Sequence, residues 1–166
     1  TDLGENRVQE ALEKFPALAG VRRHLIGHLQ RNKAAQALET FDLIHSVDSL
    51  RIAERLSFKA VRPMPVLLEV NAGLGEDRYG FLPEELDDAV GRIRGLSNIE
   101  VTGLMAMAPF GAGESDCRRV FGRVRELARG LGLPALSMGM SADYPWAIAE
   151  GATLVRIGSA LFGRER

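Results

Sequence analysis

The sequence has little cysteine and no long apolar run, and each shortage excludes a class of protein. Cys117 is the single cysteine, so the chain forms no internal disulfide and no cysteine-based metal site, and we expect Cys117 to be a packing residue. No segment approaches the roughly 18 consecutive apolar residues of a membrane-spanning helix. The first residues also lack the basic and apolar regions of a secretory signal. We therefore predict a cytoplasmic protein with no membrane association.

Neither sign of charge dominates the sequence. The 21 basic and 22 acidic side chains give a formal net charge of −1, which is not the balance expected of a protein that binds nucleic acid or an anionic membrane. The 166 residues, of which 46% are hydrophobic and 26% charged, suffice for one hydrophobic core and are too few for two ordinary domains. We predict a single domain over residues 1–166 and no nucleic-acid partner.

Apolar runs that are typical of buried strands alternate along the chain with helical patterns. The runs cover residues 24–28, 42–47, 66–70 and 101–108, and an amphipathic helix is predicted over residues 115–131. Strands separated by single helices predict an α/β fold with a parallel sheet and right-handed crossovers. The pattern leaves open whether this sheet is an open, doubly wound one or a closed barrel.

Residues 134–163 contain two strand-to-loop junctions that follow one pattern. In the first, a short apolar run precedes Ser137 and Ser141, and a helical pattern follows from Ala142 to Glu150. We expect Ser141 to be the N-cap of this helix, because a serine oxygen at that position accepts a hydrogen bond from an N–H group one turn later. The N–H groups that stay free at such a helix end attract an anion.

The second junction repeats this arrangement. Residues 154–157 alternate as a strand, Gly158 allows backbone to approach a ligand closely, and Ser159 opens a final turn. A (β/α)₈ barrel commonly makes a phosphate site from its last two junctions of this kind, so the pair predicts a shared phosphate site. The alternative is that both junctions serve only as turns. Arg156 lies inside the apolar strand, where its charge needs an anion or another acceptor.

Several motifs follow one another over nearly the whole sequence: GENRVQE (4–10), HLIGHLQRNK (24–33), IHSVDS (44–49), LLEVN (67–71), GLMAMAP (103–109), and finally SMGMSADY with EGATLVRIGSALFG. In this order they resemble the pyridoxal phosphate homeostasis proteins, which are relatives of the alanine racemase barrel domain. The resemblance implies a (β/α)₈ TIM-type barrel, pyridoxal 5'-phosphate as the cofactor, and a non-enzymatic carrier that buffers this cofactor. It also implies transfer of the cofactor to enzymes that depend on it.

The resemblance further implies a set of cofactor-binding residues. Arg156 would face the pyridine nitrogen and keep it unprotonated, because two positive charges at hydrogen-bond distance repel each other. An unprotonated ring is a weaker electron sink, which suits a holder of the cofactor better than a strong catalyst, although alanine racemase shares this arginine and an enzyme is therefore not excluded. Met138 would pack near the face of the ring, and Asn6 would lie at the rim of the site. The phosphate and junction residues would be Ser137, Ser141, Gly158 and Ser159.

The same resemblance implies a segment that this sequence does not contain. Relatives carry, ahead of the GENRVQE motif, a first barrel strand whose end holds a lysine that forms a Schiff base with the cofactor. The three lysines here, Lys14, Lys33 and Lys59, do not end a predicted strand, and we expect them on the surface. We therefore expect a barrel that lacks its first strand, with the strands at residues 1–4 and 153–157 on the two sides of a gap.

Other interpretations of the polar residues stay open at the level of sequence. His28 and His45, near strand ends, are either acid–base groups or structural hydrogen-bonded histidines. The acids Glu5, Glu69 and Asp143 would suit a paired-carboxylate hydrolase, although nothing fixes their separation. The alternative functions are a pyridoxal phosphate-dependent amino-acid racemase and a barrel enzyme that acts on a phosphorylated small molecule. The oligomeric state is left undecided.

Overall fold

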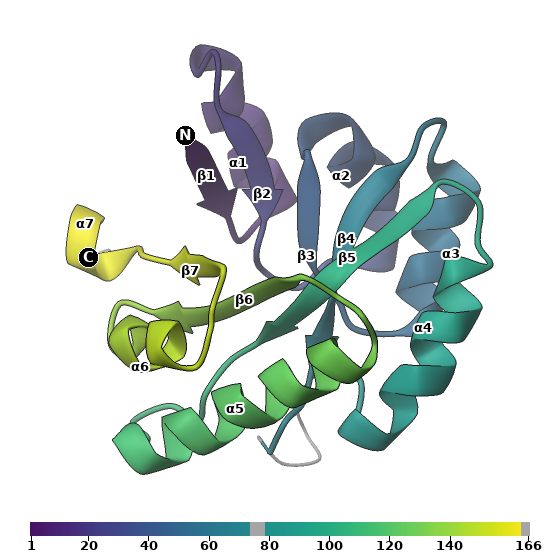
Figure 1. Cartoon of the computed structure of the whole chain (residues 1–166). Coiled ribbons are helices and arrows are strands. Elements are labelled where there is room, and N and C mark those ends of the chain that lie inside the picture. The colour runs from purple at the N-terminus through teal and green to yellow at the C-terminus, as the bar shows by residue number, and fades with distance from the viewer. Residues whose placement is uncertain (74–78, 164–166) are drawn as a thin grey trace.

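The computed structural model describes residues 1–73 and 79–163 (Figure 1). The long loop predicted over residues 71–80 therefore lies partly outside the described residues. Within them, seven parallel strands form one sheet in the order of the sequence. The strands are β1 (Asp2–Glu5), β2 (Arg22–Leu25), β3 (Leu43–Val47), β4 (Met64–Val70), β5 (Ile99–Ala106), β6 (Ala135–Met140) and β7 (Leu154–Arg156).

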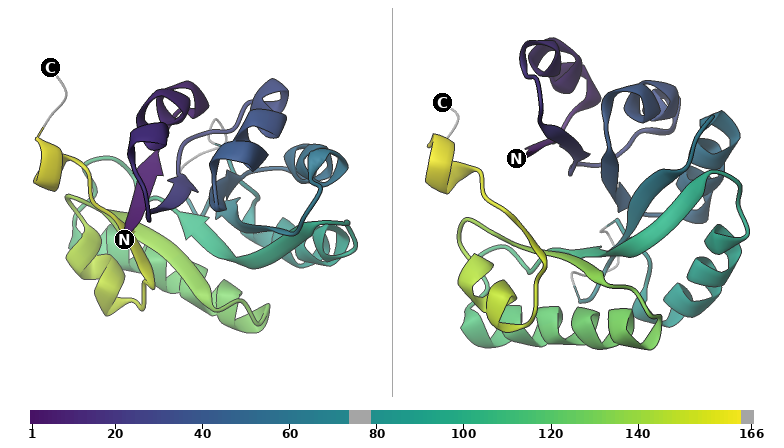
Figure 2. Two further views of the ribbon diagram at one scale, coloured as in Figure 1. Left: turned by 90° about the horizontal axis from the view of Figure 1, so that it is seen from above. Right: turned by 45° about the horizontal axis from the view of Figure 1, so that its top comes forward.

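Helices follow the strands one by one and lie along the outer face of the curved sheet (Figures 1 and 2). No helix in the described part of the chain is long and apolar enough to cross a membrane. The α-helices are α1 (Val8–Lys14), α2 (Ala34–Thr40), α3 (Leu50–Lys59), α4 (Leu86–Arg94), α5 (Glu114–Gly130), α6 (Tyr144–Ala149) and α7 (Ser159–Phe162), and the 3₁₀ turns are η1 (Phe15–Ala17), η2 (Arg31–Lys33) and η3 (Pro83–Glu85).

The central strands β3 and β4 bury both of their faces. In β4, Val66 and Leu68 belong to the main hydrophobic cluster between sheet and helices. The residue between them, Leu67, belongs to a second cluster with Leu43 of β3 and Met105 of β5. Because successive side chains of a strand point to opposite faces, this second cluster lies on the inner, concave face of the sheet. A parallel sheet covered on both faces confirms the predicted α/β barrel and explains the nearly continuous apolar runs.

The two end strands of the sheet are β1 and β7, and no ladder joins them within residues 1–73 and 79–163. The right-hand view of Figure 2 shows the sheet curling around its axis, with β1 on one side of the opening and β7 on the other. The barrel is therefore nearly closed, as expected for strands at residues 1–4 and 153–157 that flank a gap. The ends of β6 and β7 that carry the two predicted junctions lie next to each other, because β6 pairs with β7 in parallel.

Candidate functional site

Arg156, the last residue of β7, is held by acceptors from two other strands. Its Nη1 donates to the carbonyl oxygen of Ser137 at 2.8 Å and to Ser137 Oγ at 2.6 Å, and its Nη2 donates to the carbonyl oxygen of Ala106 at 3.0 Å. Burial lowers the pKa of Arg156 to about 10, and the carboxylates of Glu69 and Asp143 oppose that shift. The guanidinium therefore stays charged at neutral pH, and its acceptors on β5 and β6 fix its position.

Ser137 connects this arginine to a polar layer in the barrel interior. Ser137 Oγ lies 2.8 Å from His45 Nδ1, and His45 Nε2 lies 2.9 Å from His24 Nδ1. Burial is the main reason that the pKa of His45 falls to about 3, with repulsion from His24 and Arg156 adding to it. The structure thus supports the hydrogen-bonded alternative for His45. The sequence did not indicate the part of His24 in this layer, although His24 opens the strand expected over residues 24–28.

Glu69 and the neighbouring pair of His28 and Asp48 are further ionisable groups of the barrel. Glu69 of β4 exposes 6% of its surface, and burial followed by repulsion from Asp48 raises the pKa of its carboxyl to about 7. His28 Nδ1 lies 3.0 Å from Asp48 Oδ2, and the His28 ring stacks on Tyr79 with 3.9 Å between the centroids. Within the described residues, no group of three or more histidine, cysteine or acidic side chains is arranged to hold a metal ion.

The two junctions meet at Ser141. Its Oγ accepts a hydrogen bond from the amide of Gly158 at 3.3 Å and another from the amide of Ala160 at 3.2 Å. Gly158 precedes α7, whose first residue is Ser159, as expected for the final turn. A side chain at Gly158 would meet no atom within 4 Å, so the space beside this backbone is open. The amides at the start of α7 therefore converge on one oxygen at an open edge.

Two expectations for the first junction are corrected. Ser141 is not a helix N-cap, because α6 begins only at Tyr144. The intervening residues form a turn in which Asp143 Oδ1 accepts from the amide of Met140 at 2.6 Å, and this leaves the Ser141 hydroxyl for the second junction. Met138 is fully buried in the cluster between sheet and helices. Strand alternation turns it away from Ser137, so its side chain does not line the barrel interior.

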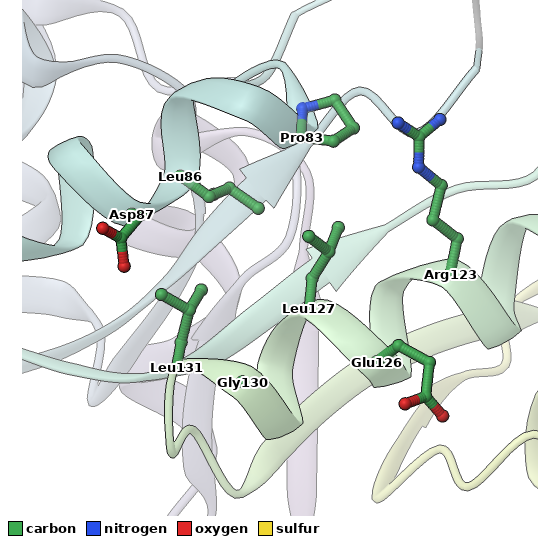
Figure 3. A pocket seen from close by; sticks show the side chains of 8 residues that line it. All are labelled: Pro83, Leu86, Asp87, Arg123, Glu126, Leu127, Gly130 and Leu131. Atoms are coloured by element: carbon green, nitrogen blue, oxygen red, sulfur yellow. The ribbon is translucent and has the colours of Figure 1, made fainter.

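Asn6, the expected rim residue, follows the end of β1 and lies apart from the two junctions. It lines a cavity of about 400 Å³ together with Arg7, Val8, Gln9, Gly27, His28, Gln30 and Lys33. A second cavity, of about 450 Å³, is a groove on the outside of the barrel between α4 and α5, where Leu86, Leu127 and Leu131 face one another (Figure 3). This groove is far from the strand ends that carry Arg156 and is no part of the candidate site.

The three lysines do not lie at the junctions. Lys14 of α1 donates to Glu5 Oε1 at 2.8 Å and to Glu10 Oε2 at 3.2 Å, and half of its side chain is exposed. Lys33 borders the cavity near Asn6, and the Lys59 ammonium lies 5.5 Å from the centre of the Phe58 ring. The surface positions expected for Lys14 and Lys59 agree with these contacts.

The chain forms a nearly closed parallel barrel, with a fixed arginine and converging amides at its last two strands. The sequence profile of the alanine racemase N-terminal domain matches residues 1–166. Within this class the chain belongs to the family of pyridoxal phosphate homeostasis proteins. It is 42% identical to the member from Synechocystis sp., over 98% of this chain and 80% of that protein, and 44% identical to the member from Pseudomonas aeruginosa, over 98% and 74%.

Solved structures agree with this assignment. PipY of Synechococcus elongatus, solved without pyridoxal phosphate, superposes with a TM-score of 0.90 at 40% identity and covers 96% of this chain and 80% of its own. The same protein with pyridoxal phosphate bound gives a TM-score of 0.86. Alanine racemase of Clostridium difficile, at 17% identity, shares the fold with a TM-score of 0.81, over 99% of this chain and 45% of that one.

Proposed function

We propose that the chain binds pyridoxal 5'-phosphate as a non-catalytic carrier in cofactor homeostasis. The observation that carries the proposal is the fixed Arg156 cation on β7, next to the amides of Gly158 and Ala160 that converge on Ser141 Oγ. The pyridoxal phosphate homeostasis proteins of Synechocystis sp. and Pseudomonas aeruginosa, as relatives, and the pyridoxal phosphate bound to PipY support it.

The residues present fit this ligand at two points. A phosphate group needs N–H and O–H donors beside open space. The hydroxyls of Ser141 and Ser159 would supply O–H donors, and the amides of Gly158 and Ala160 would supply N–H donors when the phosphate replaces Ser141 Oγ as their acceptor. A pyridine nitrogen next to Arg156 would stay unprotonated, because the guanidinium is already positive. The cofactor, when bound, brings a reactive aldehyde, and the protein's part is to hold it and to limit its contact with other amines.

The phosphate part of the proposal is tested with the double variant Ser141→Ala/Ser159→Ala. We expect it to bind pyridoxal 5'-phosphate about tenfold more weakly, the effect of losing hydrogen bonds to a charged ligand, in a calorimetric titration. Pyridoxal without phosphate should bind equally to both forms. Ser57→Ala is the control, since Ser57 bonds the Ser97 carbonyl elsewhere in the chain. Equal affinity of the double variant and the wild type for pyridoxal 5'-phosphate would remove these serines from the site.

The non-catalytic part is tested by incubating the loaded chain with L-alanine and separating the products on a chiral column. We expect no D-alanine above the level that free cofactor produces. An unprotonated ring is a weak electron sink, but alanine racemase is expected to share it, so the assay itself decides between the two functions. Formation of D-alanine by the chain would favour the racemase alternative. The proposal also includes a cytoplasmic location and release of the cofactor to enzymes that need it. The release is measured by placing an apoenzyme on the other side of a dialysis membrane and following the recovery of its activity.

A further inference from the structure

The barrel interior holds two histidines that the proposed cofactor site leaves without a role. His45 lies between Ser137 and His24, at 2.8 Å and 2.9 Å respectively. At the outer end of the row, His24 Nε2 lies 3.1 Å from Asp2 Oδ1 on β1, a charge contact whose geometry is not that of a hydrogen bond. His24, His45 and Ser137 expose 4%, 2% and 0% of their surfaces. The row therefore crosses the barrel from β6 to β1 and reaches water only at Asp2, whose side chain is 56% exposed.

The inner end of the row is compatible with a Ser137 hydroxyl that donates onward, because an arginine side chain only donates and Ser137 Oγ accepts from it. Arg156 Nη1 donates to Ser137 Oγ, so the Ser137 hydroxyl can donate its own hydrogen to His45 Nδ1. A neutral imidazole that accepts at Nδ1 carries its proton at Nε2, so His45 donates to His24. His24 then carries its proton at Nε2, facing the Asp2 carboxylate.

The opposite direction is disfavoured at the outer end. If His45 donated to Ser137, His24 would donate from Nδ1 and turn the lone pair of a neutral Nε2 toward the negative Asp2. A charged His24 would avoid that contact, but the pKa of His24 is lowered. Burial is the main cause and the positive Arg22 contributes, and together they outweigh the attraction of Asp2 and Asp42. His45 faces only positive or neutral groups, namely His24, Arg156 and Arg22, which also keep it neutral.

We infer that Ser137, His45 and His24 form a one-way row of hydrogen bonds that orients Arg156, that the nearby Asp2 carboxylate sets its direction, and that both histidines are positioning residues for this cation. The row needs no ligand to form. Its consequence for the cofactor rests on the proposed function, because the position of the Arg156 guanidinium determines its contact with the pyridine nitrogen. Each histidine acts through the next group and touches no ligand itself.

The first test uses the ligand-free chain. Nitrogen-15 NMR of the histidine rings distinguishes Nδ1–H from Nε2–H forms, and His28→Gln identifies the signals of the two interior rings. We expect His24 and His45 to be neutral Nε2–H forms at pH 7. An Nδ1–H form of His45, or a doubly protonated His45 at that pH, would overturn the inference whether or not the cofactor binds.

The second test compares two substitutions at one position. Glutamine can accept with its oxygen and donate with its nitrogen, so His45→Gln can preserve the row, whereas His45→Leu interrupts it. We expect roughly tenfold weaker binding of pyridoxal 5'-phosphate to His45→Leu, the effect of leaving a buried polar group without its hydrogen-bond partner, and near wild-type binding to His45→Gln. Equal losses in both folded variants would contradict a role in positioning. If the wild-type chain binds no pyridoxal 5'-phosphate, the proposed function fails, and the NMR result alone decides the row.

Discussion

Single buried ionisable residues control how this barrel responds to pH. Glu69 is an acid on an inner strand position, where it is 6% exposed and where Asp48 and Arg156 act on its charge in opposite directions. The folded-state pKa of this carboxyl is about 7 and its ordinary value is 4.5, so its ionisation lowers the free energy of unfolding. Below pH 4.5 the group is protonated in both states, so it costs nothing there. Between pH 4.5 and 7 the unfolded chain releases the proton first, and stability falls as pH rises.

We therefore expect Glu69→Gln to stabilise the protein at pH 8 and not at pH 4. The expected gain at pH 8 is up to about 3 kcal/mol, since each pH unit between the two pKa values corresponds to roughly 1.4 kcal/mol. Urea unfolding of wild type and variant at both pH values measures it. Glu39→Gln, at an exposed position of α2, is the matched control. A gain of the same size at pH 4 would show that Glu69 acts through packing and not through its charge.

The lysines make a second residue-level prediction. None of Lys14, Lys33 and Lys59 lies at Arg156 or Ser141 in the structure, so we expect the cofactor to be held without a covalent bond to a chosen lysine. Borohydride reduction at equal concentrations of chain and cofactor, followed by peptide mass spectrometry, should find little modification, spread over all three. Complete modification of one lysine would show that it serves as the attachment point, and its alanine variant would then lose binding.

At the scale of elements, the closure of the sheet depends on how near adjacent strands come. Gly103 of β5 lies where β6 passes closely: a Cβ at this position would lie 2.0 Å from the backbone oxygen of Ala135. Backbone atoms of paired strands cannot give way without breaking the ladder between Gly103 and Ala135. The glycine therefore permits the β5–β6 pairing that brings the Ala106 carbonyl to Arg156.

We expect Gly103→Ala to destabilise the fold by more than about 2 kcal/mol, the range of overpacking changes in a core. Gly91 provides the opposite case, because it lies inside α4 and a Cβ there would meet no atom within 4 Å. Gly91→Ala should stabilise the protein by about 0.5–1 kcal/mol through helix propensity. Thermal unfolding of both variants followed by circular dichroism tests the pair. Similar effects of the two changes would mean that the β5–β6 contact is not what requires glycine.

At the scale of the whole molecule, the strands at the two ends of the sheet set its tendency to associate. β1 and β7 each have a partner on one side in the described residues, and a free strand edge is a template for pairing with another chain. Val155, in the middle of β7, is 38% exposed, so an apolar side chain lies on this edge. We expect the 166-residue chain by itself to self-associate as its concentration rises.

Val155→Lys should reduce this association, because a charge on an edge strand opposes strand addition. Sedimentation velocity over a range of concentrations measures the effect. Val61→Lys is the control, since Val61 is 94% exposed in the turn before β4 and away from the edge. A wild-type chain that stays monomeric at every concentration, with cooperative unfolding, would refute the edge as a site of association.

The sequence alone carried the order of strands and helices, because apolar periodicity and turn residues are local properties of the chain. It also placed Arg156, Ser137, Gly158 and Ser159 at two junctions, since each junction is a continuous segment. The tertiary structure decided which side chains meet. It turned Ser141 from an expected helix cap into the acceptor of two amides from the next junction, and it put Met138 in the outer core.

The row from Asp2 to Arg156 belongs wholly to the tertiary level. Its five residues lie on β1, β2, β3, β6 and β7, and Ser137 is 92 residues away from His45 along the chain. No local pattern relates residues at such separations, because the curvature of the sheet alone brings β3 across from β6. A strand by itself fixes only the face on which a side chain lies. The curvature of the whole sheet determines which other side chain it meets.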